Sequence, residues 1–215
     1  MALVVFSVAM QADYKAARRH LMRTDPKLAA IIKRIGPCEL HAAAPKDPFE
    51  ALCLSIASQQ LSTKAADTIF RRFCELFPPD RRPSPERVMT LTDDEIRGVG
   101  FSRPKVGFIK DLASQVLDGR LDLAGLTKHP DEEVMRQLVG VKGIGRWTAE
   151  IFLMFRLGRP DILPADDLGL MNAVHRVYKL RKRPDAKRLR KMGETWRPYR
   201  SVASWYLWAS LDRDR

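Results

Sequence analysis

The sequence predicts an all-α fold, and three observations support that prediction. Helix-start signals recur along the chain, apolar residues return at three- and four-residue steps, and alternating strand patterns are nearly absent. The connections between these segments are short, and the clearest loop is 77–83 (FPPDRRP). A chain of 215 residues is long enough for one well-filled core or for two small lobes that share a cleft.

Several helix starts share one pattern, in which a capping side chain precedes a proline at the first helical position. This pattern predicts helices that begin at Asp25-Pro26, Asp47-Pro48 and Ser84-Pro85. Other helices are predicted by a capping box, by acids in a first turn or by apolar spacing, at 92–95, 131–133, 106–116 and 170–178.

The charge balance indicates the kind of partner. The chain has 38 Lys and Arg against 26 Asp and Glu, a formal net charge of +12. Such a balance favours a polyanionic partner, and nucleic acid is the commonest one. The segment from Arg176 to Arg200 holds 11 of the cations and only two acids. This segment either holds a DNA backbone or is a solvated surface.

Cysteine usage and hydropathy predict a cytoplasmic location and argue against disulfide bonds, metal sites and membrane spans. The three cysteines are odd in number and form no Cys-x-x-Cys pair, so we expect no disulfide framework and no metal site. No segment reaches the roughly 20 apolar residues of a membrane span. The apolar start of the chain, 1–10, lacks the basic residues of a signal peptide. We expect a cytoplasmic protein with no membrane partner.

The segment 138–149 (LVGVKGIGRWTA) is the most informative part of the chain. It predicts a helix that starts near Pro130, a tight glycine turn and a new helix from about Arg146. Gly140 stands where helices often end on a glycine. Gly143 and Gly145 can take backbone angles closed to other residues and leave no side chain between backbone and partner.

The N-terminus of the second predicted helix is suited to an anion. Its first free N–H groups point outward, so a phosphate fits there by dipole and by hydrogen bond. Lys142 adds a charge, and Ile144 is expected to turn inward and anchor the turn. Taken alone, the glycine pattern is equally consistent with a tight helix–helix corner that binds nothing.

A second informative segment, 163–170 (LPADDLGL), predicts a proline turn, two acids and a helix start. One acid in this position would be an ordinary N-cap, and the second exceeds that need. A carboxylate beside a deoxyribose can stabilise the positive charge that builds on the sugar when an N-glycosidic bond breaks. It can also orient or deprotonate the attacking water.

These segments together resemble the helix–hairpin–helix DNA glycosylase superfamily, which includes endonuclease III. The run Gly143 to Ala149 (GIGRWTA) resembles the 3-methyladenine glycosylases of the AlkA type, as do the segments 49–62 and 196–208. The resemblance covers roughly residues 47 to 210. It implies a helical glycosylase fold in which two helical lobes surround a cleft. The longer bacterial enzyme also has a β-rich N-terminal domain, so this chain is expected to be a compact form.

The resemblance assigns roles to individual residues. Asp167 is expected to be the catalytic carboxylate, because the family's catalytic Asp directly precedes its helix, and Asp166 is then expected to be a structural partner. Trp147 and Trp208 are expected to stack on a cationic alkylated base, and the alternative for each is a packing residue of the core. The hairpin and its neighbours are expected to hold DNA through Gln60, Lys142, Gly143, Gly145, Arg146 and Thr148.

Gln60 is the expected wedge that fills the gap left by a flipped base. Its alternative role is to cap, together with Gln59, the end of the preceding helix. No cofactor is expected, apart from a monovalent cation that the family often binds through hairpin carbonyls.

The position two residues after the last hairpin glycine separates two mechanisms. Lyase-competent family members carry a lysine nucleophile there, and this chain has Trp147. A tryptophan forms no Schiff base, so a monofunctional enzyme is expected. Ile151 and Leu168 stand where the longer bacterial enzyme has pocket tyrosines.

The sequence therefore predicts a monofunctional glycosylase for alkylated purines, acting as a monomer on double-stranded DNA that contains damaged bases in a bacterial cell. The expected organisation is one domain, 1–215, with a hairpin lobe at about 49–157 and a second lobe from about 11–48 plus 158–215. Two alternatives are a non-catalytic helix–hairpin–helix DNA-binding protein and a glycosylase for another damaged base. The first has no need of Asp167.

Overall fold

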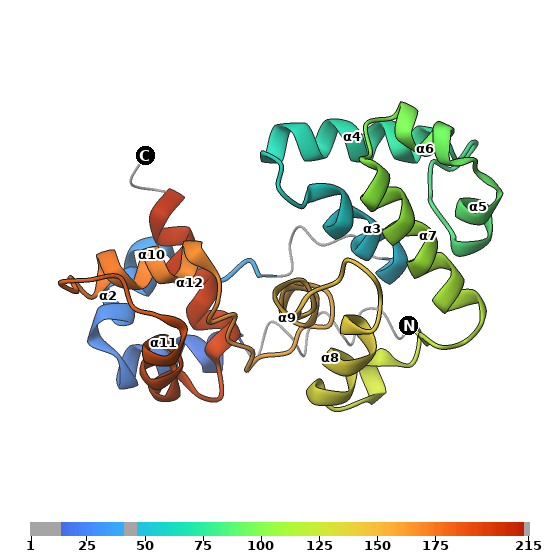
Figure 1. The fold of residues 1–215 in the computed structure, drawn as a ribbon. Helices are drawn as coiled ribbons and strands as arrows, with labels where there is room; N and C mark the ends of the chain where they lie inside the picture. The colour runs from blue at the N-terminus through green and yellow to red at the C-terminus, as the bar shows by residue number, and fades with distance from the viewer. Residues whose placement is uncertain (1–13, 41–46, 213–215) are drawn as a thin grey trace. The chain divides into compact units, whose positions relative to one another are not determined.

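The computed structural model describes residues 14–40 and 47–212, and every regular element in those ranges is helical (Figure 1). The all-α prediction is therefore confirmed, with no strand in the part described. The chain divides into two compact units. Unit 1 comprises residues 1–43 and 153–215, and unit 2 comprises residues 44–152.

Unit 2 consists of the middle of the chain. Its elements are α3 (Pro48–Ser58), α4 (Thr63–Glu75), α5 (Pro85–Thr90), α6 (Asp93–Gly98), α7 (Arg103–Leu117), η1 (Leu126–Lys128), α8 (Asp131–Val139) and most of α9 (Arg146–Phe155). Helix α7 packs against α3, α5 and α6, and α3 also packs against α4. Leu52, Ile56, Phe73, Ile109 and Leu112 are fully buried there. The longest helix, α7, thus forms the centre of this unit.

Unit 1 joins the two ends of the chain. A helix over 14–24 precedes α2 (Pro26–Ile35), and the unit continues with α10 (Leu168–Val177), α11 (Ala186–Gly193), η2 (Glu194–Trp196) and α12 (Arg200–Asp212). Helix α12 packs against α2 and α10, as the blue and red ribbons show (Figure 1). Trp196 and Tyr206 are fully buried among the aliphatic residues of this core.

The predicted helix starts are found where the capping signals place them. Asp25, Asp47 and Ser84 each accept a hydrogen bond from a backbone N–H of the first turn. Thr92 and Glu95 form the predicted capping box. Asp25 also accepts from Trp196 Nε1 (3.0 Å) and from the Tyr178 hydroxyl, so one capping acid links α2 to the C-terminal end of α10 and to η2.

Within the described ranges, no helix combines the length and the hydropathy that a membrane crossing requires.

Candidate functional site

The hairpin between α8 and α9 has the predicted course. Helix α8 ends at Val139, and the turn closes through N–H groups of Val141 and Ile144 that donate to the carbonyls of Leu138 and Val141 (3.1 Å each). Ile144 is 3% exposed, so it does anchor the hairpin in the core of unit 2. Helix α9 begins at Arg146, and Ala149 N makes its first helical hydrogen bond, to Gly145 O.

The three hairpin glycines differ from one another, which corrects the prediction that treated two of them alike. Gly143 has φ +81°, and a Cβ added there would lie 2.2 Å from the Phe108 ring. Gly145 has no left-handed φ, and a Cβ would meet nothing within 4 Å. Gly140 ends α8 with a right-handed φ of −65°. Gly143 is therefore required by the fold, whereas Gly145 leaves open space in front of the backbone.

Side chains from distant helices hold the hairpin in place. Gln59 Nε2 donates to Gly143 O (2.8 Å), and Gln115 Nε2 donates to Gly140 O (3.2 Å) and to Asp111 Oδ2 (2.7 Å). The same Asp111 oxygen accepts the N–H of Lys142 (2.9 Å). The backbone from 140 to 143 is thus held by the side-chain amides of Gln59 and Gln115 and by the carboxylate of Asp111. Sequence reasoning missed Asp111 and Gln115 and gave Gln59 no such contact.

The loop between α3 and α4 is held by a further residue that the sequence does not indicate. Lys105 Nζ donates to the carbonyls of Ala57 and Gln59 (2.7 Å each), so it caps the end of α3. Burial lowers the pKa of this ammonium group. Gln60 then has φ +59° and an exposed side chain, and Leu61 is also exposed. The loop therefore presents Gln60 outward, while Gln59 ties it to the hairpin.

The predicted contact residues around the hairpin differ in accessibility. Lys142 has a side chain that is 77% exposed, with Nζ 3.9 Å from Asp111 Oδ1. Arg146 pairs with the buried carboxylate of Glu150 (2.9 Å). Thr148 is 5% exposed, so at this position the backbone N–H of the first α9 turn, rather than the hydroxyl, suits a phosphate. Trp147 is 46% exposed, unusually high for a tryptophan.

In unit 1 the structure brings two predicted site residues together. Asp167 is the N-cap of α10, where its Oδ1 accepts the N–H of Leu170 (2.5 Å). The same oxygen accepts Trp208 Nε1–H from α12 (2.9 Å). The Trp208 ring stacks on Phe155, with centroids 6.1 Å apart and planes at 27°. Trp208 thus orients the carboxylate, a role that spacing alone did not predict.

The neighbouring acid has a different environment. Asp166 pairs with Arg190 of α11 (2.8 Å), and both side chains are about half exposed. The two acids thus differ in their contacts, with Asp166 in a surface ion pair and Asp167 in a set of directed hydrogen bonds. Leu168, beside Asp167, is 60% exposed.

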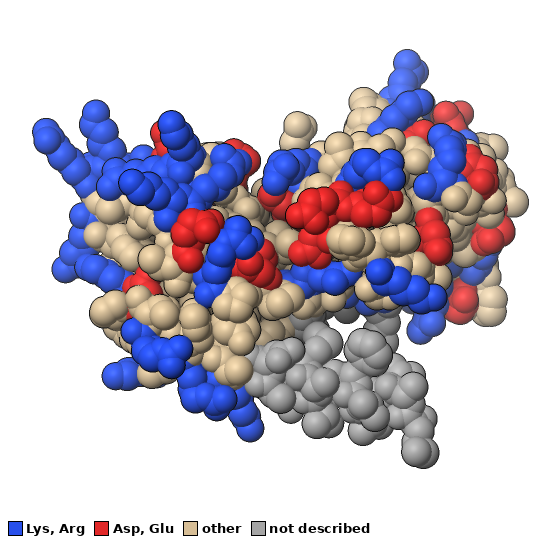
Figure 2. Space-filling view, turned by 90° about the horizontal axis from the view of Figure 1, so that it is seen from below, with Lys and Arg blue, Asp and Glu red and all other residues tan. Residues whose placement is uncertain are grey.

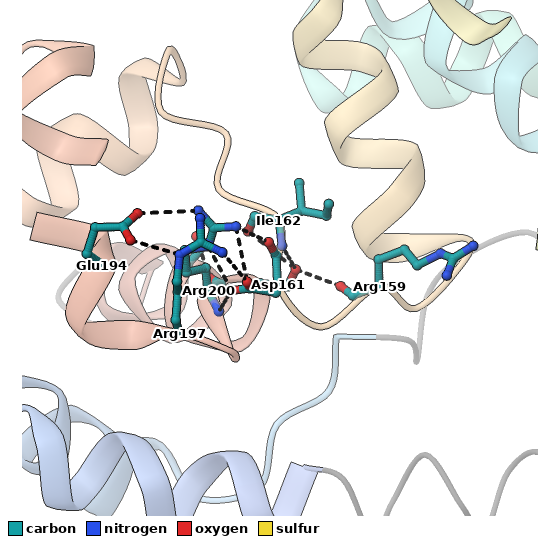
Figure 3. A network of polar contacts seen from close by, with 8 residues as sticks. Arg159, Asp161, Ile162, Glu194, Arg197 and Arg200 are labelled. Atoms are coloured by element: carbon teal, nitrogen blue, oxygen red, sulfur yellow. Dashed lines mark hydrogen bonds and ion pairs between the residues drawn. The ribbon is translucent and has the colours of Figure 1, made fainter. Parts of the chain in front are cut away.

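A polar network fixes the connection that leads from α9 to this carboxylate (Figure 3). Asp161 accepts from Arg200 Nε (2.7 Å) and from Arg197 Nη1 (2.8 Å), and Arg200 also donates to the Asp161 carbonyl. Ser201 Oγ donates to Arg159 O (2.7 Å) and accepts from Ile162 N (2.9 Å). The network joins the connection to the start of α12, which carries Trp208 eight residues further on. The segment 196–201 is therefore a structural part of the site.

Gly169 lies against the Asp167–Trp208 hydrogen bond. A Cβ added there would lie 3.1 Å from Asp167 Oδ1 and 3.5 Å from Trp208 Nε1. We expect Gly169→Ala to displace the carboxylate by a few tenths of an ångström and to lower the rate of any reaction that uses it several-fold, because misplacement of a reacting group is costly. Single-turnover assays with Gly107→Ala as control measure this, since a Cβ at Gly107 meets nothing within 4 Å. Equal rates in the two variants would remove Gly169 from the site.

A groove elsewhere on unit 1 contains none of the predicted site residues. It has a volume of about 560 Å³ and lies between α2 and α10. Among the described residues, no group of three or more His, Cys, Asp and Glu is placed to hold a metal ion.

The hairpin and the fixed carboxylate define a class of protein that comparison with known proteins identifies. Residues 53–198 match the family described as HhH-GPD superfamily base excision DNA repair protein. The chain belongs to this superfamily.

Its relatives include two proteins of Schizosaccharomyces pombe. The chain is 34% identical over 203 residues to alkylbase DNA glycosidase-like protein mag2, covering 94% of this chain and 95% of the relative. It is also 34% identical over 194 residues to DNA-3-methyladenine glycosylase 1, covering 89% and 85%.

Two solved structures have the same fold. The S. pombe 3-methyladenine DNA glycosylase Mag1, in complex with abasic DNA, matches with a TM-score of 0.85 and 34% identity over 92% of this chain and 97% of that one. A DNA-3-methyladenine glycosidase from Bacillus halodurans matches with a TM-score of 0.80 and 35% identity over 90% and 88%.

Proposed function

We propose that this chain is a monofunctional DNA glycosylase that excises alkylated purines of the 3-methyladenine and 7-methylguanine type from double-stranded DNA and leaves an abasic site. The observation that carries the proposal is the Asp167 carboxylate, held at the start of α10 by the Leu170 N–H and the Trp208 indole N–H. A DNA-binding module has no use for an acid oriented in this way. The names of the relatives agree with the proposal.

The reaction breaks the bond between the deoxyribose and the base. Positive charge grows on the sugar as the bond lengthens, and a fixed negative charge nearby stabilises it. Asp167 supplies that charge and orients the water that attacks the sugar. A cationic alkylated base is a good leaving group, so no elaborate general acid is needed.

DNA is held through its backbone at the hairpin. Gly145 and the first turn of α9 offer N–H groups to phosphate, and Lys142 offers an exposed ammonium. Gln60 is the wedge that enters the duplex when the damaged base is flipped. Trp147 stacks on the flipped base. Trp208, the second tryptophan expected to stack there, already has one face of its ring covered by Phe155. The protein acts as a monomer on chromosomal DNA in the cytoplasm of a bacterial cell.

The proposal includes a monovalent cation bound at the hairpin, which the resemblance to the family implies. The carbonyl oxygens of Gly140 and Gly143 each accept one side-chain amide N–H, and the second lone pair of each is available to a cation.

We expect Trp208→Phe to lower base release about tenfold while DNA affinity remains. The substitution keeps an aromatic ring and removes the N–H that orients Asp167, and a hydrogen bond to a charged group is worth about 1.5–3 kcal/mol. Trp205→Phe on the same helix is the matched control, because Trp205 packs against Tyr206 and is no part of the site. An unchanged rate in Trp208→Phe would assign Trp208 to packing.

The monofunctional mechanism predicts abasic sites without strand breaks. We expect methylated duplex DNA treated with the protein to break only after hot alkali, because Trp147 occupies the position of the lyase lysine. Borohydride treatment during the reaction should give no covalent protein–DNA product. A strong covalent band would contradict the mechanism.

A further inference from the structure

The net positive charge of the chain belongs entirely to one of its two units. Unit 1 has 22 Lys and Arg against 10 Asp and Glu, a net charge of +12. Unit 2 has 16 of each kind, so the unit that carries the hairpin is neutral. On the face shown in Figure 2, blue side chains gather over unit 1, and blue and red are interspersed over unit 2. Long-range attraction to a polyanion therefore comes from unit 1.

The densest group of unit 1 cations, eight of the 22, lies after α10 and along α11. We call the segment 179–191 the basic ridge. It has eight exposed cations: Lys179, Arg181, Lys182, Arg183, Lys187, Arg188, Arg190 and Lys191. Its one acid, Asp185, is occupied as the N-cap of α11, where it accepts the N–H of Arg188 (2.7 Å). Arg190 is paired with Asp166, and the side chains of the other seven cations form no ion pair with an acid in the described part of the chain.

The basic ridge is an ordered surface. Lys179 takes a left-handed φ of +51°, and Leu180 N donates to His175 O (3.0 Å), which turns the chain sharply after α10. Pro184 and Leu189 are buried and anchor the ridge in the core of unit 1. The cations thus project from a fixed backbone, which reduces the entropy lost when they bind.

We propose that the basic ridge is a second DNA-binding surface, which contacts the phosphates of the duplex independently of the hairpin and of any damaged base. The choice of DNA as the partner of this ridge rests on the proposed function. The neutral hairpin unit offers backbone N–H groups, which act at short range, whereas the ridge supplies the charge that captures DNA. The ridge has no aromatic residue. This favours phosphates of a duplex over the stacked bases of a single strand.

The test compares two variants that lose the same charge. The ridge variant carries Arg181→Ala, Lys182→Ala and Lys187→Ala. The control variant carries Arg72→Ala, Arg97→Ala and Lys128→Ala, three exposed cations of unit 2. Affinity for an undamaged duplex is measured from 50 to 300 mM salt, and folding is checked by thermal melting. Arg181→Lys, which keeps the charge, is expected to bind as the wild type does.

The ridge variant should lower the slope of log K against log salt by about 2–3, since each phosphate contact contributes about 0.9. The control variant should leave the slope unchanged. An equal fall in both variants, or an unchanged slope in the ridge variant, would overturn the proposal. Because the probe is undamaged DNA, a protein that releases no base can still show the ridge effect. Failure of the proposed function is therefore distinguishable from failure of the inference.

Discussion

Asp167→Asn is expected to abolish base release while DNA binding survives. The amide keeps the shape of the side chain and its place at the start of α10, and it removes the negative charge that opposes the sugar cation. Loss of one preorganised charge-stabilising group costs about 3–4 kcal/mol in the transition state, or 10²- to 10³-fold in rate. Single-turnover release from methylated duplex DNA measures this loss, and equilibrium binding to the same duplex measures affinity.

Asp166→Asn is the matched control for this substitution. Asp166 is adjacent in the chain and forms a half-exposed ion pair with Arg190, which contributes little to stability. We expect this variant to release bases at close to the wild-type rate. Near-normal activity in Asp167→Asn, together with a large loss in Asp166→Asn, would reverse the assignment of the two acids.

Substitutions at the two hairpin glycines should have different effects. Gly143→Val should destabilise unit 2 by about 2–5 kcal/mol, because it combines a strained left-handed backbone with a clash against the Phe108 ring. Gly145→Val should leave folding near normal, because open space surrounds that position. It should instead weaken binding to all DNA sequences alike, about tenfold, since backbone approach to phosphate carries no sequence information.

Thermal melting and DNA binding separate the two glycine effects. The expected pattern is a lowered melting temperature for Gly143→Val and a lowered affinity at nearly constant melting temperature for Gly145→Val. A Gly145→Val protein that keeps its affinity for undamaged DNA and loses only lesion preference would show that the hairpin does not hold the backbone.

The local features of the fold follow from the sequence, because they depend on neighbouring residues. The capping signals at Asp25, Asp47 and Ser84 and the start of α9 at Arg146 are all set within one helical turn. Asp167 at the start of α10 is likewise a local prediction, made from a proline turn followed by acids. The cleft between two lobes stays a prediction.

The contacts that give the site its geometry could not be predicted in the same way. Gln59 meets Gly143 across 84 residues, and Trp208 meets Asp167 across 41. Lys105 could equally have been a solvated lysine on α7, since nothing in its neighbours indicates two carbonyl acceptors. The difference between Gly143 and Gly145 depends on where the Phe108 ring lies, which is a property of tertiary packing.

The most direct test of the proposed function is to identify the bases that the protein releases. Duplex DNA treated with a methylating agent, and a second duplex that contains hypoxanthine, are incubated with the wild-type protein and with Asp167→Asn, and the free bases are separated by chromatography. The account predicts that the wild type releases 3-methyladenine and 7-methylguanine faster than hypoxanthine, and that the variant releases each base about 10²- to 10³-fold more slowly. Release of hypoxanthine in preference to the cationic bases, or no release of any base by the wild type, would contradict it.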